Sequence, residues 1–249
     1  MFDLSLKGKG KISNLPFWHY VEDNFLPEEL ATKLYLEFPP YKDQNLQSYD
    51  NPLECKRIQS HWFEFKPLTY KFINFLNSKE FIDFISSKTG INDLKADSGL
   101  HGAGQFMHTK GGRLNPHQDY SIHPKLGLER RLSLLIYLTP KWQKNWYGDL
   151  VLYEKKEKLC EVKRISPLFN RLVIFQTTSS WHGIPEFINC PAGVCRNAIG
   201  IFYLTEPRKN HLKHKKALYC TYGDQEGNAE IEELIKQRSS EKTAKSVYL

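Results

Sequence analysis

The sequence predicts an α+β fold that is mainly β, in which an N-terminal helical layer precedes an antiparallel β core. Apolar residues in the first half recur at helical spacing, as in Leu30, Leu34 and Phe38. After about residue 100, short apolar runs alternate with turn residues, which is typical of a sandwich or a barrel. The 249 residues, 40% of them hydrophobic, suffice for one domain with a sizeable core.

Three helices are expected in the first hundred residues. The first begins at Pro27, because proline fits the first helical turn and the acidic pair that follows suits the positive end of the helix dipole. A second covers roughly Leu68–Leu76. A third covers Lys79–Lys88, with Ser78 as its N-cap and Gly90 just after its end.

Four strong strands are expected in the second half, separated by turns rich in proline and glycine. They are Leu132–Leu138, Leu150–Tyr153, Arg171–Gln176 and Ala198–Leu204. A terminal helix is expected within Glu226–Arg238.

These elements predict one domain over residues 1–249. A helical and mixed support region at 15–100 precedes the β core at 101–206, and a basic tail with the terminal helix occupies 207–249. The net charge is +7 and the pI about 9.0, with much of the excess early in this tail. A solvated tail without a partner is the simpler interpretation, and no basic stripe with interleaved aromatics indicates nucleic-acid binding.

The composition indicates a cytoplasmic protein with no membrane partner. Mean hydropathy is −0.54, and no apolar run approaches the ~18 residues of a membrane-spanning helix. The N-terminus lacks the apolar segment and cleavage site of a secretory signal. Five cysteines are too few for a disulfide framework; a loop disulfide between Cys190 and Cys195 is the alternative to reduced thiols. A monomer or a homodimer is expected.

A set of three side chains indicates a metal site. His117 and Asp119 are two apart in an extended segment, so their side chains point to the same side, although this pair alone is a weak signal. His182 follows the strand Arg171–Phe175 and completes a set of two histidines and one carboxylate. Such a facial set leaves open coordination positions, as non-haem Fe(II) oxygenases require. A structural zinc site would want a fourth protein ligand.

Arg196 indicates an anion-binding site on the last strong strand. It shares a face with Ala198 and Gly200, whose small side chains leave room beside it. A guanidinium deep in a barrel must have an anionic partner, and a dicarboxylate co-substrate supplies one in bidentate form. Tyr137 lies on the expected strand Arg131–Leu138, and its hydroxyl can donate a hydrogen bond to the same carboxylate.

The stretch from about Gly104 to Thr205 resembles the double-stranded β-helix core of the 2-oxoglutarate/Fe(II)-dependent dioxygenase superfamily, in its prolyl 4-hydroxylase-like branch. The resemblance rests, in family order, on His117-Gln118-Asp119, Arg131–Trp142, Gly148–Leu150, Asn170–Phe175, Ser180–Pro185 and Arg196–Tyr203. It implies a jelly roll with N-terminal helices packed on one of its sheets.

The resemblance also assigns roles to the residues that match. It makes His117, Asp119 and His182 the iron ligands, Arg196 the partner of the distal co-substrate carboxylate, and Tyr137 a hydrogen-bonding neighbour. It implies Fe(II), 2-oxoglutarate and O2, with ascorbate as a candidate reductant. The implied reaction hydroxylates a C–H bond and releases succinate and CO2. Related halogenases replace the acidic ligand with a small residue, so Asp119 favours hydroxylation.

Other residues are weaker candidates. The branch often has a tyrosine on the strand before the first ligand, whereas this sequence offers Met107 and His108 there. His108, Arg130 and Trp181 are candidate substrate contacts. Their alternative interpretations are a solvent-facing strand residue, a surface arginine and a packing residue.

We expect an enzyme that acts on a small-molecule or amino-acid-like substrate. A peptidyl-prolyl hydroxylase is the first alternative, because fold analogy does not fix the substrate. A non-catalytic β-barrel that binds a metal or ligand is an alternative of another class, and it predicts no co-substrate turnover. A nucleic-acid demethylase rests on the pI alone.

Overall fold

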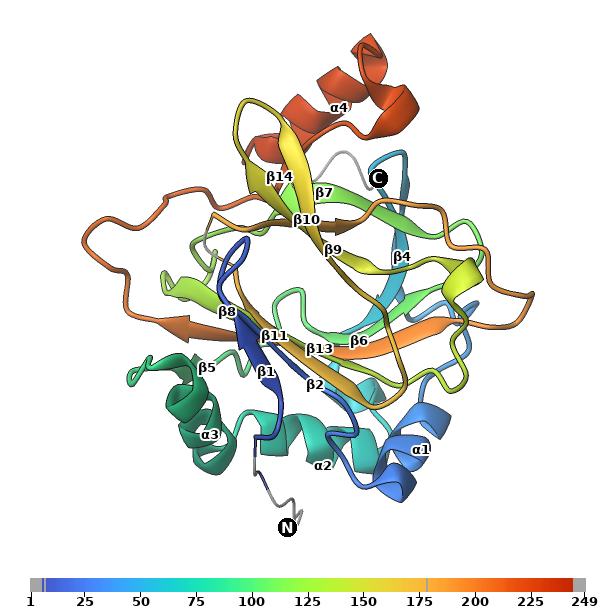
Figure 1. Ribbon diagram of the computed structural model, residues 1–249, viewed down its shortest axis with the longest axis vertical. Helices are drawn as coiled ribbons and strands as arrows, with labels where there is room; N and C mark the ends of the chain where they lie inside the picture. The colour runs from blue at the N-terminus through green and yellow to red at the C-terminus, as the bar shows by residue number, and fades with distance from the viewer. Residues whose placement is uncertain (1–5, 7, 178, 244–249) are drawn as a thin grey trace.

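A single curled antiparallel sheet organises the residues that the structure, a computed structural model, describes: 6, 8–177 and 179–243 (Figure 1). Its strands are β1 Lys11–Ser13, β2 His19–Glu22, β3 Gln47–Asn51, β4 Glu54–Gln59, β5 Lys95–Ala96, β6 Gly104–His108, β7 Arg113–Gln118, β8 Glu129–Tyr137, β9 Leu150–Lys155, β10 Leu159–Ile165, β11 Arg171–Gln176, β12 Trp181–Ile184, β13 Arg196–Thr205 and β14 Leu218–Tyr219. The helices are α1 Glu28–Leu36, α2 Pro67–Leu76, α3 Lys79–Thr89 and α4 Ala229–Ser239.

The sheet folds over into two layers. Its path runs β1-β2-β11-β8-β13-β6-β4-β7-β12-β9-β10, with β14 added to β7, β3 to β4 and β5 to β13. Because β4 pairs with both β6 and β7, it joins the two layers on one side, while β1 and β10 are the two ends of the path. This curled sheet with few helices confirms the expected mainly β class and its double-stranded β-helix core.

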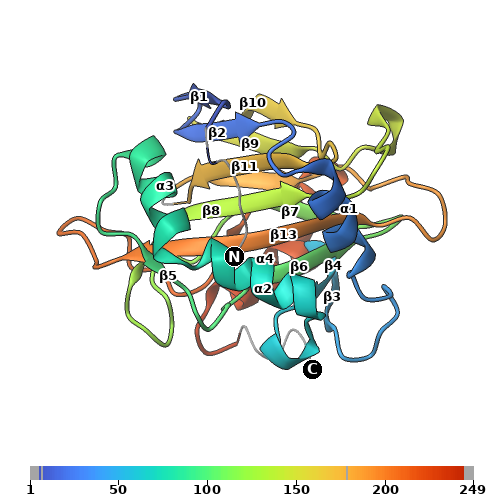
Figure 2. The ribbon, with the colours of Figure 1, turned by 90° about the horizontal axis from the view of Figure 1, so that it is seen from below.

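Helices α1, α2 and α3 cover the outer face of the layer that contains β8, β11 and β13 (Figure 2). Alternation along β8 separates the two faces, since Leu134 and Ile136 join the core under the helices while Tyr137 belongs to a cluster inside the barrel. The expected helical layer on one sheet is therefore confirmed. Its third helix has the expected ends, with Ser78 accepting from the Phe81 N–H and Gly90 at φ 71°.

The support region also supplies strands that the sequence did not predict. β2 and β4 both come from this region. β2 pairs with β11, and β4 pairs with both β6 and β7. Their sequences are short and carry many polar residues, so they lack a clear alternating pattern.

The C-terminal segment turns back onto the sheet. β14 pairs with β7, and α4, which lies where the sequence predicted a terminal helix, packs beside β14 on the side of the molecule opposite to α1–α3 (Figure 1). All five cysteines are free thiols. No described helix is both long enough and apolar enough to span a bilayer.

Candidate metal centre and adjacent pocket

Two neighbouring strands and the residue after one of them bring the predicted donors together. His117 lies near the end of β7, Asp119 follows that strand, and His182 lies on β12. β7 and β12 are antiparallel neighbours with His117 opposite His182, and the two ring centroids are 4.3 Å apart. The shared parity of His117 and Asp119 turns both side chains into the same space.

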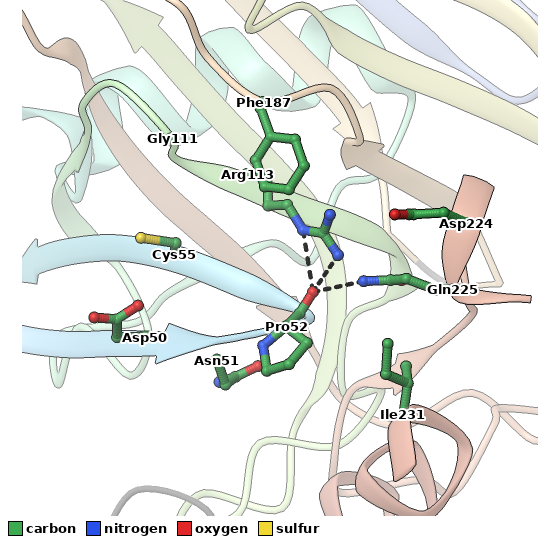
Figure 3. Close-up of a pocket in the computed structure, with 10 residues that line it drawn as sticks. All are labelled: Asp50, Asn51, Pro52, Cys55, Gly111, Arg113, Phe187, Asp224, Gln225 and Ile231. Carbon is green, nitrogen blue, oxygen red and sulfur yellow. Dashed lines mark hydrogen bonds between the residues drawn. The ribbon is translucent and has the colours of Figure 1, made fainter. Parts of the chain in front are cut away.

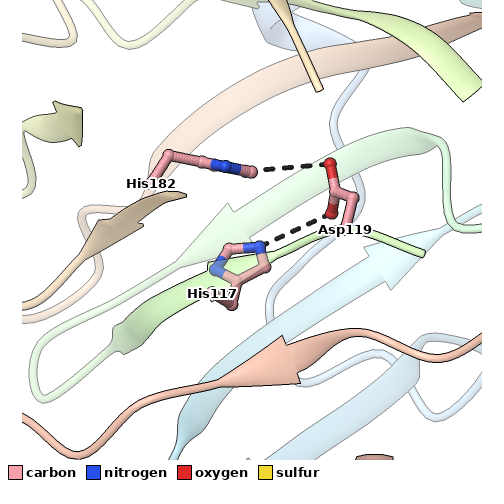
Figure 4. A group of neighbouring side chains, drawn as sticks. All are labelled: His117, Asp119 and His182. Carbon is pink, nitrogen blue, oxygen red and sulfur yellow. Dashed lines mark ion pairs between the residues drawn. The ribbon is translucent and has the colours of Figure 1, made fainter. Parts of the chain in front are cut away.

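The donor atoms are spaced for one metal ion (Figure 4). Nε2 of His117 is 3.5 Å from Oδ1 of Asp119, Nε2 of His182 is 3.7 Å from Oδ2, and one atom from each residue lies within 4.8 Å of the others. Both histidines are buried, at 5% and 6% exposure. Two imidazole nitrogens and one carboxylate fit a divalent transition metal that keeps open positions for other ligands.

Backbone carbonyls fix which nitrogen of each histidine faces the centre. Nδ1 of His117 lies 3.0 Å from the Asn115 carbonyl oxygen, and Nδ1 of His182 lies 3.1 Å from that of Ser180. A carbonyl oxygen only accepts, so Nδ1 carries the proton in each ring. The lone pair on Nε2 therefore points at the metal position.

The protonation states of these groups favour metal binding. Burial, followed by the neighbouring His117, lowers the pKa of His182 to about 3. Burial alone would raise the pKa of Asp119, but Arg130 and the two histidines together hold that pKa well below its usual range. At neutral pH the site thus offers a neutral His182 and an ionised Asp119, and neither must lose a proton to bind a cation.

Arg130, a candidate substrate contact, is placed against a metal-ligand residue. Its Nη1 is 3.1 Å from Oδ2 of Asp119, and the residue is 2% exposed. The guanidinium lies between the rings of Tyr120 and Phe202, 3.8 Å and 3.3 Å from their centroids. A buried cation needs an anionic partner, and Asp119 is that partner for Arg130.

Deeper in the barrel, Arg196, Tyr137 and His108 gather side-chain polar atoms that lack partners. β13 places Arg196 opposite His108 of β6 and Ala198 opposite Tyr137 of β8. Nε of Arg196 donates to the Gly148 carbonyl at 2.6 Å, and the guanidinium lies against Tyr137, 4.7 Å from its ring centroid. No hydrogen bond of good geometry is made by Arg196 Nη2, Tyr137 Oη or either ring nitrogen of His108 among the described residues. Buried donors left without partners fit a bound carboxylate.

The register also separates His108 from Met107. Met107 pairs with Asn197 and belongs to the core on the helical side, whereas His108 faces Arg196 in the interior. His108 rather than Met107 therefore lies on the same face as the Arg196 guanidinium.

One expectation about space beside Arg196 is wrong at Gly200. A Cβ at Gly200 would lie 2.0 Å from Cε2 of Phe106, so an aromatic ring already fills that side. Gly148 is the glycine that matters for Arg196: it has φ +84°, and a Cβ there would lie 3.1 Å from the Arg196 Cδ. This close approach lets the Gly148 carbonyl accept from the guanidinium.

We expect the unfolding free energy of His108→Gln to fall less steeply on acidification than that of the wild-type protein. Burial, followed by the positive charges of Arg196 and Lys56, holds the pKa of His108 well below the ordinary 6.5. Below about pH 6.5 the unfolded chain binds a proton that the folded protein excludes, so stability is complete above that pH and falls on acidification. The variant should lose less unfolding free energy, by up to about 1.4 kcal/mol per pH unit. Denaturant melts at several pH values test this, and equal slopes contradict it.

Trp181 lines a cavity of about 500 Å³ whose lining contains none of the metal-site donors. Because successive residues of a strand face opposite sides, Trp181 points away from the face of His182 and packs in a separate cluster with Val151 and Tyr153. Other parts of the lining are Gln118, which lies between two of the donors, Ser180, which precedes Trp181, and Phe17 from the segment between β1 and β2. The other tryptophans of this half have packing roles: Trp142 and Trp146 contact each other edge to face at 5.3 Å in a separate apolar cluster.

A second cavity, of about 330 Å³, lies at the far end of β7 (Figure 3). Arg113, the first residue of β7, and Gln225, from the C-terminal segment, both donate to the Pro52 carbonyl there. None of the residues that line this cavity is a metal-site donor. At this cavity the C-terminal segment is attached to the sheet through the Pro52 carbonyl.

No sequence pattern predicted a role for Tyr219, which stacks on His117. The two ring centroids are 5.5 Å apart and the rings are inclined by 21°. β14 contains only Leu218 and Tyr219, which is too short for a periodic signal. Only its pairing with β7 reveals this contact.

The comparisons agree with this geometry. Residues 104–204 match the 2OG-Fe(II) oxygenase superfamily. A prolyl-4-hydroxylase from Pseudomonas putida has 17% identity and a TM-score of 0.54, over 76% of this chain and 93% of that one. A prolyl hydroxylase from Trichoplax adhaerens, solved with a peptide fragment of hypoxia inducible factor, has 19% identity and a TM-score of 0.50, over 75% and 83%. These structures share the fold. No curated protein matches the sequence.

Proposed function

We propose that this chain, of which residues 104–204 match the 2OG-Fe(II) oxygenase superfamily, is a dioxygenase that hydroxylates a C–H bond of a small-molecule or amino-acid-like substrate. Fe(II) and 2-oxoglutarate are the cofactor and co-substrate of the superfamily, and ascorbate is the proposed reductant. When bound, iron and 2-oxoglutarate would let O2 act as the oxidant: one oxygen atom enters the substrate, the other enters succinate, and CO2 leaves.

One observation carries the assignment of residues. A set of metal donors and a buried, incompletely bonded guanidinium occupy the interior of one barrel. In the proposal, His117, Asp119 and His182 hold the iron. Arg196 and Tyr137 bind the distal carboxylate of 2-oxoglutarate, since a dicarboxylate removes the cost of burying an unpaired cation.

Two further residues complete the proposed roles. His108 contributes a further hydrogen bond to the distal carboxylate, because its ring is neutral and both ring nitrogens lack partners among the described residues. Arg130 occupies one oxygen of Asp119, which leaves the other for the metal. The retained carboxylate favours hydroxylation over halogenation.

The cavity beside Trp181 supports a small substrate. Its volume of about 500 Å³ falls within the range of small-ligand sites. Phe17 and Trp181 supply apolar surface, and the Gln118 carboxamide supplies a polar group. In the proposal, Trp181 packs against a part of the substrate that lies away from the reacting C–H bond.

A peptidyl-prolyl substrate is the second candidate. It is favoured by the shared fold with the Trichoplax adhaerens prolyl hydroxylase, whose structure contains a peptide fragment. A cytoplasmic location, as a monomer or a homodimer, is proposed with either substrate, because five cysteines without framework spacing suit a reducing compartment.

Succinate release across a broad substrate panel tests the function. We expect Fe(II)- and 2-oxoglutarate-dependent succinate that rises with a compound from the amino-acid or small-molecule arm. A response confined to proline-containing peptides would select the second candidate. Absence of iron and 2-oxoglutarate binding by the wild-type protein would instead favour a non-catalytic barrel.

A further inference from the structure

Tyr219 and the segment that carries it form one wall of the candidate metal centre. β12 pairs His182 with His117 on one edge of β7, and β14 pairs Tyr219 with His117 on the other edge. The His117 ring is thus flanked by two rings in direct cross-strand register, with centroids at 4.3 Å and 5.5 Å. Tyr219 is 7% exposed, so its ring is fixed by packing.

We propose that Tyr219 is a positioning residue for His117, and that the segment from β14 to α4 thereby completes the metal centre. This inference rests on the proposed function, in which His117 is an iron ligand. It extends the site beyond the residues 104–204 that match the superfamily. The contact of Nδ1 with the Asn115 carbonyl restrains one edge of the His117 ring, and stacking on Tyr219 restrains its plane.

Backbone and side-chain contacts bind the segment to β7 around this ring. The Cys220 N–H donates to the Pro116 carbonyl at 2.9 Å, next to His117. Nδ2 of Asn115 donates to the Cys220 carbonyl at 3.0 Å and to Oε1 of Gln225 at 2.5 Å. The segment therefore hydrogen-bonds to Asn115, the residue whose carbonyl orients His117.

A buried ion pair anchors Tyr219 itself. Nη2 of Arg238, on α4, lies 3.2 Å from the Tyr219 hydroxyl, and the guanidinium lies 5.3 Å from the ring centroid. The same nitrogen donates to Oε1 of Glu54 at 2.6 Å, and Oε2 of that carboxylate is 2.8 Å from Nζ of Lys56. Glu54 is 1% exposed, so breaking this pair would leave a buried charge poorly compensated.

The test is Co(II) binding to the full-length, metal-free protein, followed by its visible absorption. Tyr219→Leu removes the ring and should weaken Co(II) binding by about 10–100-fold, the usual effect of losing a residue that orients a metal ligand. Tyr219→Phe keeps the ring and should bind Co(II) as the wild type does. An affinity as weak as that of Tyr219→Leu would contradict a role for stacking.

Two more variants separate positioning from general stability. Tyr203→Leu removes another buried tyrosine, whose hydroxyl donates to Leu76 on the helical side, and it should leave Co(II) affinity unchanged. Arg238→Met releases the anchor but keeps the ring, and it should weaken Co(II) binding in the same direction as Tyr219→Leu. If Tyr219→Leu does not fold, the Co(II) affinity of Arg238→Met still tests whether Tyr219 positions His117.

The outcomes distinguish this inference from the proposed function. A folded Tyr219→Leu or Arg238→Met variant with wild-type Co(II) affinity overturns the inference and leaves the function intact. Equal weakening in Tyr203→Leu also overturns it. A wild-type protein that binds no Co(II) removes the proposed function itself.

Discussion

His117→Ala or Asp119→Ala is expected to abolish the visible charge-transfer band that the wild-type protein forms with Fe(II) and 2-oxoglutarate under anaerobic conditions. Each variant removes one of three donors that lie within 4.8 Å of one another. Loss of a partner that merely orients a ligand costs about 10–100-fold in metal affinity or activity, so loss of a donor should cost at least about 100-fold. Succinate release should fall with the band.

A matched histidine variant controls for nonspecific metal binding. His61 is exposed and lies outside the site, so His61→Ala should retain both the band and turnover. A full-strength band in His117→Ala or in Asp119→Ala would exclude that residue as an iron ligand. A band that also disappears in His61→Ala would point to loss of folding or to surface binding.

Arg196→Ala should weaken 2-oxoglutarate binding by roughly 100-fold or more. Charge-assisted hydrogen bonds contribute about 1.5–3 kcal/mol each, two of them are expected at a bidentate carboxylate, and 1.4 kcal/mol corresponds to a factor of ten. The free side of this guanidinium, at Nη2, faces no described hydrogen-bond partner that could substitute for the co-substrate. Titration of the anaerobic Fe(II) protein with 2-oxoglutarate measures the change.

Conservative and distant variants sharpen this second test. Arg196→Lys keeps the charge but not the forked geometry, so its affinity should lie between those of wild type and Arg196→Ala. Arg164→Ala removes an arginine of β10 that pairs with Glu186, and it should leave 2-oxoglutarate affinity unchanged. Wild-type affinity in Arg196→Ala would refute the carboxylate assignment and leave the metal centre untouched.

Local sequence signals predicted elements of both the β core and the helical layer. The expected strand Arg171–Gln176 matches β11, and the expected helix Lys79–Lys88 differs from α3 by one residue at its end. Both have strong periodic patterns and clear flanking residues. β2 and β4 lack such patterns, because their pairing partners rather than their own sequences make them strands.

The contacts around the donors could not be predicted in this way. Arg130 faces Asp119, a ring of Phe106 fills the space at Gly200, and His108 rather than Met107 lies opposite Arg196. The last two depend on register between β6 and β13, which are far apart in the chain, and the first depends on the path of the chain between β7 and β8. A shift of one residue would turn every side chain of a strand to the other face, and spacing within a single segment does not contain that information.

The sequence by itself determined the mainly β class and named the metal donors, because parity within a strand decides which side chains share a face. The tertiary structure alone decided what surrounds those donors. Tyr219 reaches His117 only because β14 returns to β7 and α4 delivers Arg238 to the buried Glu54. These contacts link residues more than a hundred positions apart, and only packing of the whole chain brings them together.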